Sequence, residues 1–294
     1  MRVIDCHVHL YPPAVNRQPA AWAAAHGEHH WAALSNRRRQ SGQAVQTFPS
    51  LKELLRAMDG AGAARAVLLG WYWEEVATCV MQNRFYEKCV RAHPDRLAWF
   101  ATLHPKAGQG ATLDQVRRAE GEGACGLGEL SPHSQGYRVN DPVFGAVMAL
   151  AGELRLPVNL HVTDPDSGNY PGRVATPLRD FVWLARKFPQ TTFILAHWGG
   201  LLPLRDPSAL KLANVYYDTA ASPLLYREDI WRKFLAAVPK ERVLFGSDYP
   251  LNVYPRIDAA PNMGRLIAEL HRAVSSADQL QAVVCDNATR VISR

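Results

Sequence analysis

Close to its N-terminus the sequence reads Val3-Ile4-Asp5-Cys6-His7-Val8-His9-Leu10, an apolar run that polar residues interrupt at regular spacing. A run of apolar and β-branched residues of this kind predicts a buried β-strand. His7 and His9 stand two positions apart, so an extended backbone directs both imidazoles to the same side. Two converging imidazoles form a natural pair of metal ligands, because neutral histidine is the commonest one. A single pair also occurs by chance, and its meaning depends on the residues that the rest of the chain adds.

Further short apolar runs follow along the chain and alternate with stretches of helical periodicity. Several are apolar at consecutive positions, as expected of strands that are covered on both faces of a parallel sheet. Repeated strand and helix units predict an α/β fold, and eight of them favour a (β/α)8 TIM barrel over a doubly wound sheet. The eight predicted strands are Val3–Leu10, Ala66–Gly70, Leu97–Leu103, Cys125–Leu130, Pro157–Val162, Thr192–Trp198, Val215–Ala220 and Val243–Tyr249.

Helical periodicity fills the intervals between these strands, and turn signals such as His93-Pro94-Asp95 end helices where strands should begin. The predicted helices are Leu51–Asp59, Glu75–Ala92, Thr112–Glu120, Pro142–Leu154, Pro177–Phe188, Leu204–Leu212, Tyr226–Ala237 and Pro261–Val274.

The stretch from Tyr11 to Ser50 does not fit this rhythm. It follows the first strand and carries Trp22, Trp31 and the basic run Arg37–Arg39. Long connections inside compact domains are usually functional or mobile. We expect residues 11–50 to form an insertion that closes over the substrate as a lid, with a dimer contact as the alternative. No low-complexity linker is present, so residues 1–294 are expected to form one domain.

The length of 294 residues exceeds the roughly 200–250 residues of a typical barrel, and the insertion accounts for most of the surplus. Hydrophobic residues make up 48% and charged residues 20%, which excludes a disordered chain. The net charge is +6, and the basic residues are scattered along the chain except for the run Arg37–Arg39, which we interpret as part of a solvated surface. Nucleic acid is therefore not an expected partner. The five cysteines include no C-x-x-C pair that would indicate a zinc or redox motif. We expect them to be small buried side chains of a protein in a reducing compartment.

No apolar run is long enough to span a membrane, and the first residues lack the pattern of a signal peptide. We therefore expect a soluble, cytoplasmic protein without a membrane partner.

Acids and histidines interrupt the later strands where each of them ends. These interruptions are Glu129 at the end of the fourth predicted strand, His161 at the end of the fifth, His197 at the end of the sixth and Asp248 at the end of the eighth. The carboxyl ends of barrel strands form one rim, where the active sites of this fold lie. Burying an acid there is costly unless it is paired or coordinated. The sequence therefore predicts a divalent metal site whose ligands are His7, His9, Glu129, His161, His197 and Asp248.

The motifs Asp5-Cys6-His7-Val8-His9, Gly128-Glu129, His161, Ala196-His197-Trp198-Gly199-Gly200 and Gly246-Ser247-Asp248-Tyr249-Pro250 resemble those of the amidohydrolase superfamily, in particular its amidohydrolase-related branch. The resemblance extends over essentially the whole chain. It is specific for the superfamily and much less so for the reaction. Members hydrolyse amides, esters, lactones and phosphoesters, and some decarboxylate aromatic acids or hydrate double bonds.

The resemblance implies roles for the six residues. His7, His9 and Asp248 would bind the more buried ion, while His161 and His197 would bind a second one, with Glu129 bridging the two. In members with a single ion, the residue at the position of His161 joins that ion and the one at His197 acts on substrate or water. Both arrangements remain open, and Glu129 favours two ions.

Histidine and carboxylate ligands suit Zn²⁺, with Mn²⁺ as the alternative. Such an ion activates a bound water, and Asp248 would take up the proton of that water and pass it to the leaving group, with His197 as the second catalytic candidate. We expect a hydrolase of a small carboxylate-bearing lactone, ester or amide. The alternative is a decarboxylase of an aromatic or unsaturated acid, which a single ion with a free His197 would favour.

Substrate contacts are expected from the loops that follow the strands. Aromatic side chains and arginines there would suit a small substrate with a carboxylate, although the aromatic residues could instead pack the barrel mouth and the arginines could be surface charges. The candidates are Trp71, Trp73, His104, His133, Arg173 and Arg205. The sequence leaves the oligomeric state open.

Overall fold

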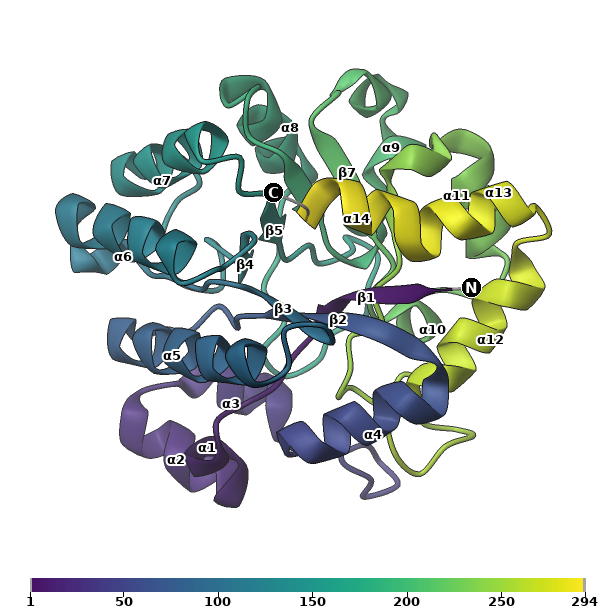
Figure 1. The fold of residues 1–294 in the computed structure, drawn as a ribbon, viewed down its shortest axis with the longest axis horizontal. Coiled ribbons are helices and arrows are strands. Elements are labelled where there is room, and N and C mark those ends of the chain that lie inside the picture. The colour runs from purple at the N-terminus through teal and green to yellow at the C-terminus, as the bar shows by residue number, and fades with distance from the viewer. Residues whose placement is uncertain (1, 293–294) are drawn as a thin grey trace.

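The computed structural model describes residues 2–292, in which eight parallel strands alternate with helices (Figure 1). All eight predicted strands are present, most of them shorter than expected. Their bounds are β1 (Val3–Val8), β2 (Ala63–Leu69), β3 (Leu97–Phe100), β4 (Leu127–Leu130), β5 (Val158–Leu160), β6 (Phe193–Leu195), β7 (Val215–Asp218) and β8 (Val243–Leu244).

The strands pair in sequence order as two sheets, β1-β2-β3 and β4-β5-β6-β7-β8. Isolated parallel bridges link the sheets at both junctions. Ala101 pairs with Leu127 between β3 and β4, and Val8 pairs with Tyr249 between β8 and β1. The ring of strands is therefore the predicted (β/α)8 barrel, whose core is filled by apolar side chains from every strand.

Helices surround this ring (Figure 1). Predicted boundaries hold for most of them, and capping explains several. Ser50 and Glu53 form a capping box at the start of α4, for example, and Asp141 caps the start of α7. The main helices are α4 (Leu51–Ala61), α5 (Val76–Ala92), α6 (Gln109–Gly121), α7 (Pro142–Glu153), α8 (Leu178–Lys187), α11 (Ile230–Ala237), α12 (Met263–Ala273) and α14 (Asn287–Ile292).

Two predicted helices were wrong in extent. The stretch Leu204–Leu212 divides into α9 (Leu202–Arg205) and a 3-10 helix (Pro207–Lys211), because Pro207 follows Asp206, which is extended and caps the second element. The predicted helix Tyr226–Ala237 begins only at Ile230, and α10 (Ser222–Leu225) is separate from it. Short helical elements also follow α12, namely α13 (Ala277–Gln281) and a π-helical turn (Ala282–Asp286).

The insertion after β1 is more ordered than a loop. It contains α1 (Pro13–Arg17), α2 (Pro19–His26) and α3 (His29–Ser35), which group beside α4 and α5 (Figure 1). The insertion has its own buried cluster, in which Trp22 and Trp31 pack against Trp73 from the segment after β2. The carboxylate of Glu28, fully buried, accepts the main-chain N–H groups of Glu74 (2.8 Å) and Glu75 (3.1 Å). These contacts fasten the insertion to the barrel rim.

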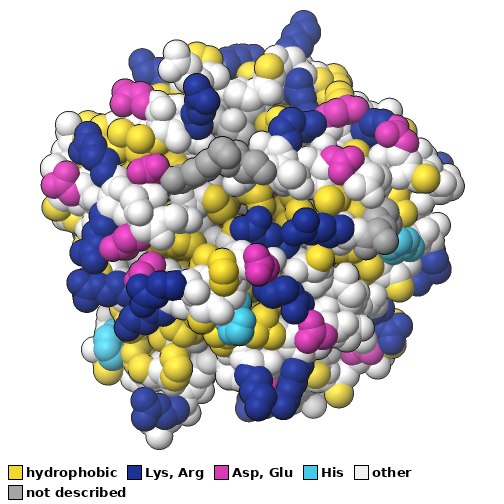
Figure 2. Space-filling view, in the orientation of Figure 1, with side chains coloured by type: hydrophobic (Ala, Val, Ile, Leu, Met, Phe, Trp, Pro, Cys, Tyr) yellow, Lys and Arg dark blue, Asp and Glu magenta, His cyan; other side chains and the backbone are white. Residues whose placement is uncertain are grey.

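The surface in Figure 2 shows Lys and Arg side chains spread over the visible face with acidic side chains between them, as the scattered charge of the sequence predicts. Among residues 2–292, no helix combines the length and the apolar character that crossing a membrane requires.

Candidate metal centre

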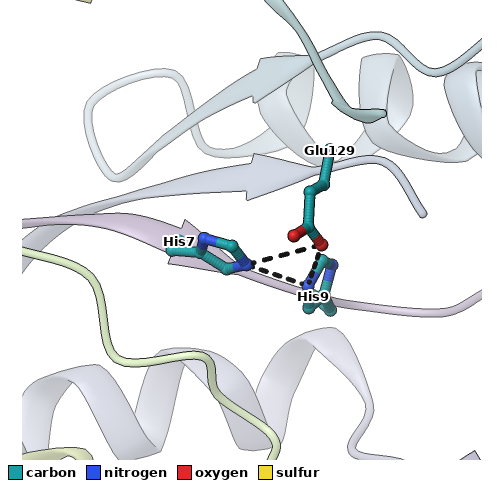
Figure 3. Close-up of side chains that lie close together, drawn as sticks. All are labelled: His7, His9 and Glu129. Atoms are coloured by element: carbon teal, nitrogen blue, oxygen red, sulfur yellow. Dashed lines mark hydrogen bonds and ion pairs between the residues drawn. The ribbon is translucent and has the colours of Figure 1, made fainter. Parts of the chain in front are cut away.

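The two histidines of the first strand converge as the sequence predicts. Nε2 of His7 lies 3.1 Å from Nε2 of His9, and both rings are almost completely buried. Glu129 points its Oε2 between them, 3.7 Å from the nitrogen of His7 and 3.5 Å from that of His9 (Figure 3). Two imidazole nitrogens and a carboxylate oxygen thus face one point from β1 and β4, a donor set that suits zinc.

The hydrogen bonds on the far side of each ring fix which nitrogen faces this point. Nδ1 of His9 lies 3.1 Å from the carbonyl oxygen of Leu69, and Nδ1 of His197 lies 3.1 Å from that of Ala220. A carbonyl oxygen only accepts, so each Nδ1 carries the proton and each neutral ring turns the Nε2 lone pair inward. These are the tautomers that a metal ion requires.

A second group of ligands lies on the other side of Glu129. Its Oε1 is 2.9 Å from Nδ1 of His161 and 3.6 Å from Nε2 of His197, and these two nitrogens are 3.2 Å apart. The groups His7, His9, Glu129 and Glu129, His161, His197 could each hold an ion, and they share the carboxylate. The carboxylate of Glu129 thus belongs to both groups of candidate ligands.

Asp248 reaches both groups from the segment after β8. Its Oδ1 lies 3.7 Å from Nε2 of His7 and 3.6 Å from Nε2 of His9, and its Oδ2 lies 4.0 Å from Nδ1 of His197. The residue has a φ of +64°, and its N–H donates to the carbonyl of His7 at 2.9 Å. That hydrogen bond helps to hold a backbone conformation that is uncommon outside glycine.

Small residues allow the ligands to approach one another. A Cβ on Gly128, next to Glu129, would lie 2.5 Å from the carbonyl oxygen of Asn159 on β5. After β6 the chain turns through left-handed conformations at His197 and Trp198, which continue through Gly199 and Gly200. The imidazole that this turn carries has its Nε2 3.6 Å from Oε1 of Glu129.

The electrostatics of the cluster favour bound positive charge. Burial alone would lower the pKa of His7, but the carboxylates of Asp218, Glu129 and Asp248 raise it to about 10. Burial alone would raise the pKa of Glu129, but His161, His197 and His7 hold it well below its usual range. A buried site lined by several carboxylates stabilises a cation. The inward-facing Nε2 lone pairs of the histidines can bind a divalent ion at the same place. The residues therefore fit a divalent metal.

A cavity of about 280 Å³ opens above the cluster. Its floor contains His9, Glu129, His161, His197 and Asp248, so the candidate ligands are accessible to a small molecule. Its walls include Trp71 and Tyr72 after β2, Tyr170 after β5, and His30, Arg37, Arg39 and Gln46 from the insertion.

The structure brings all six predicted ligands together but places only Trp71 of the six predicted substrate residues on this cavity. Trp73 is fully buried in the aromatic cluster of the insertion, and His104 lines a neighbouring groove. His133 pairs with Asp180, Arg173 binds Ser167 and main-chain carbonyls, and Arg205 forms ion pairs with Asp164 and Asp166.

Sequence reasoning did not single out several residues at or beside the site, among them His30 and Asp218, and it placed Arg37 and Arg39 only within the expected lid. Arg37, Arg39 and His30 line the cavity, although the basic run was interpreted as a solvated surface. Asp218 lies behind His7, with its Oδ2 2.9 Å from Nδ1 of that ring. Asp218 ends an apolar strand, the same signal that identified Glu129 and Asp248, so the sequence did contain an indication of it.

Comparison with known proteins agrees with this geometry. The family model for amidohydrolases matches residues 4–294. No curated protein matches the sequence. Among solved structures, 5-carboxyvanillate decarboxylase from Sphingomonas paucimobilis superposes with a TM-score of 0.72 at 16% identity, covering 99% of this chain and 98% of that one.

Two further structures carry other chemistries. A probable 2-pyrone-4,6-dicarboxylic acid hydrolase from Acinetobacter baumannii gives a TM-score of 0.67 at 15% identity, covering all of both chains. The 4-oxalomesaconate hydratase from Rhodopseudomonas palustris gives 0.67 at 17%, covering 99% of this chain and 95% of that one. At such identities the likeness establishes the barrel fold and does not select a reaction.

Proposed function

The chain belongs to the amidohydrolase family of metal-dependent enzymes, and from this premise we propose that it hydrolyses a small lactone, ester or amide that bears a carboxylate. The observation that carries the proposal is the position of Glu129. Its two oxygens face two different histidine pairs, as a carboxylate that bridges two ions would. Two-metal sites are typical of hydrolytic chemistry, which favours hydrolysis over decarboxylation.

We assign the ligands by the group to which each belongs. His7, His9 and Asp248 would hold one ion, His161 and His197 the other, and Glu129 both. Nitrogen and carboxylate oxygen donors suit Zn²⁺, with Mn²⁺ as the alternative. When bound, such an ion polarises the oxygen under attack and lowers the pKa of a coordinated water.

Asp248 is the proposed proton carrier. It is 8% exposed and lies on the cavity floor, so its carboxylate is in reach of both the ligand cluster and a bound substrate. A carboxylate there can accept the proton of the attacking water and deliver it to the leaving group. His197, whose ring also lines the cavity, would serve as a ligand of the second ion through Nε2, and only in a site with a single ion would it be free to act on substrate or water.

Arg37 and Arg39 support a substrate with a carboxylate. The guanidinium of Arg37 lies over the ring of Tyr170 at 4.7 Å, and its Nε donates to the carbonyl of Leu34. Arg39 donates to the carbonyl of Asn252, and its Nε is buried without a partner. Neither forms an ion pair with an acid among residues 2–292. Arginines of this kind are suited to binding a carboxylate of the substrate.

The insertion would act as the wall that selects the substrate. Its residues Val45 and Thr47 form main-chain hydrogen bonds with Asn252 (2.9 Å) and Pro250 (3.2 Å), just beyond Asp248. Arg37 and Arg39 are thereby tied to the segment that carries the proton carrier. We propose that the insertion, residues 11–50, closes over the cavity as a lid.

The test is a screen of carboxylate-bearing lactones, esters and amides with zinc-loaded protein, followed by the variant Asp248→Asn. We expect turnover that this variant abolishes while its thermal unfolding stays close to that of the wild type. Asp258→Asn is the matched control, because Asp258 lies on the same segment and pairs with Arg265 outside the cavity. Full activity of Asp248→Asn, or release of CO2 from an aromatic acid without any hydrolysis, would contradict the proposal.

A further inference from the structure

Asp218 is a fully buried carboxylate at the carboxyl end of β7 that accepts four hydrogen bonds. Its Oδ2 accepts from Nδ1 of His7 and Nδ2 of Asn159, both at 2.9 Å. Its Oδ1 accepts from the main-chain N–H groups of His197 and Ala220, both at 3.1 Å. One side chain therefore contacts a ligand of each candidate ion from behind.

We propose that Asp218 is the positioning residue that holds the two halves of the candidate metal centre in register, through the ring of His7 and the main chain of His197. The proposal rests on the metal centre proposed above and adds a residue that does not contact the cavity. Its support is the set of four hydrogen bonds that the Asp218 carboxylate accepts.

The first step concerns the ring of His7. An ionised carboxylate only accepts hydrogen bonds, so Nδ1 of His7 must carry the proton that points to Asp218. Nε2 is then left to face Nε2 of His9 and Oε2 of Glu129. Carboxylates that hold a ligating histidine in this way fix its tautomer and raise its basicity as a ligand.

The second step concerns the turn that carries His197. This residue has a φ of +58°, and Trp198 continues the left-handed conformation at +57°. Such conformations are unfavourable for residues other than glycine, and they persist where the surroundings hold them. Asp218 accepts the N–H of His197, while Ala220 accepts Nδ1 of the same ring. The segment from Asp218 to Ala220 therefore fixes both the main chain and the ring of His197.

The substitution Asp218→Asn separates these functions, because an amide has only one accepting oxygen. If that oxygen serves the N–H groups of His197 and Ala220, the amide NH₂ faces Nδ1 of His7 and places its proton on Nε2 instead. In the reversed orientation, the amide NH₂ faces the main-chain N–H groups of His197 and Ala220, so donors face donors. The first orientation abolishes the ligand lone pair of His7, and the second displaces the turn at His197.

We would measure zinc affinity by competition between a chelating dye and metal-free protein at fixed pH. Loss of a carboxylate behind a ligating histidine typically weakens metal binding about 10–100-fold, and we expect Asp218→Asn to fall in this range. Asp180→Asn is the matched control, because Asp180 on α8 makes another carboxylate contact to a histidine, its 2.8 Å pair with Nε2 of His133. The control should keep wild-type affinity, and unchanged affinity in a folded Asp218→Asn protein would overturn the proposal.

A second measurement does not require the variant to fold. Zinc-loaded wild-type protein with ¹⁵N-labelled histidine should show one ring Nδ1–H shifted strongly downfield by a carboxylate acceptor, because Nδ1 of His9 and of His197 faces carbonyl oxygens instead. Where the variants fold, the signal should persist in Asp180→Asn and be absent from Asp218→Asn. Absence of such a signal from zinc-loaded wild type would also overturn the role of Asp218. A wild type that binds no zinc would instead contradict the metal centre itself.

Discussion

Nδ1 of His161 lies 2.9 Å from Oε1 of Glu129, while the other oxygen of the same carboxylate faces the two histidines of the first strand. One acid is thus shared between two groups of ligands that come from four different strands or the segments after them. This sharing is what we expect of a site for two ions, and it is the structural reason for the proposal of hydrolysis.

Replacement of Glu129 by glutamine should reduce the metal content. The amide keeps the size of the side chain but cannot bridge two cations, so we expect the second ion to be lost and turnover to fall by at least about 100-fold. Metal content per chain, measured after dialysis, tests this expectation. Glu269→Gln is the control, since Glu269 is also buried but binds Trp231 and Tyr254 away from the cluster. Two ions retained in Glu129→Gln would exclude a bridging role.

The arginines of the insertion should affect substrate binding more than catalysis. Arg37 and Arg39 line the cavity, whereas Arg38 is exposed and donates to the carbonyl of Gly42. Hydrogen bonds to a charged group contribute about 1.5–3 kcal/mol, so Arg37→Ala or Arg39→Ala should raise KM about 10–100-fold for a carboxylate-bearing substrate. The value of kcat should change little. Arg38→Ala should resemble wild type, and equal effects of all three substitutions would argue against a carboxylate site.

Glu28 should make the insertion sensitive to pH. Burial raises the pKa of its carboxyl from 4.5 to about 6, against the opposing hydrogen bonds from Thr78, Glu74 and Glu75. A raised pKa in an acid means that the folded state binds the proton more tightly than the unfolded state. The stabilisation is therefore complete below about pH 4.5 and is lost as the pH rises through about 6.

The size of this effect follows from the shift of about 1.5 units, which corresponds to about 2 kcal/mol. We expect the free energy of unfolding of wild type to fall by about this amount between pH 4 and pH 7, relative to Glu28→Gln. Denaturant unfolding of both proteins at the two pH values gives the difference directly. A difference that is constant with pH, or that grows in favour of wild type, would contradict the assignment.

The sequence predicted the barrel, and it predicted that the six candidate ligands would lie together, because both depend on local patterns. Apolar strands leave a clear periodicity, and acids or histidines that interrupt them at one end, such as Glu129 and His161, must share a rim once the strands are parallel. The cavity walls were less predictable because they depend on partners from distant segments. Arg205 is neutralised by Asp164 and Asp166, and Trp73 turns into the aromatic cluster of the insertion.

The position of the basic run Arg37–Arg39 was also unpredictable from local sequence patterns. Arg37 and Arg39 reach the cavity because Val45 and Thr47 pair with the segment after β8, a contact for which the sequence carries no local signal. The helices α1 to α3 were also not predicted, since each is short and is stabilised by tertiary packing around Trp22 and Trp31 rather than by its own periodicity.

The central claim, a two-metal hydrolytic centre built around Glu129, is tested most directly by elemental analysis of wild-type protein purified without chelator. The account predicts close to two divalent ions per chain, either zinc or manganese. This measurement can be made without knowing the substrate. Folded protein that holds only one divalent ion per chain, or none, even after zinc is added, would contradict the account.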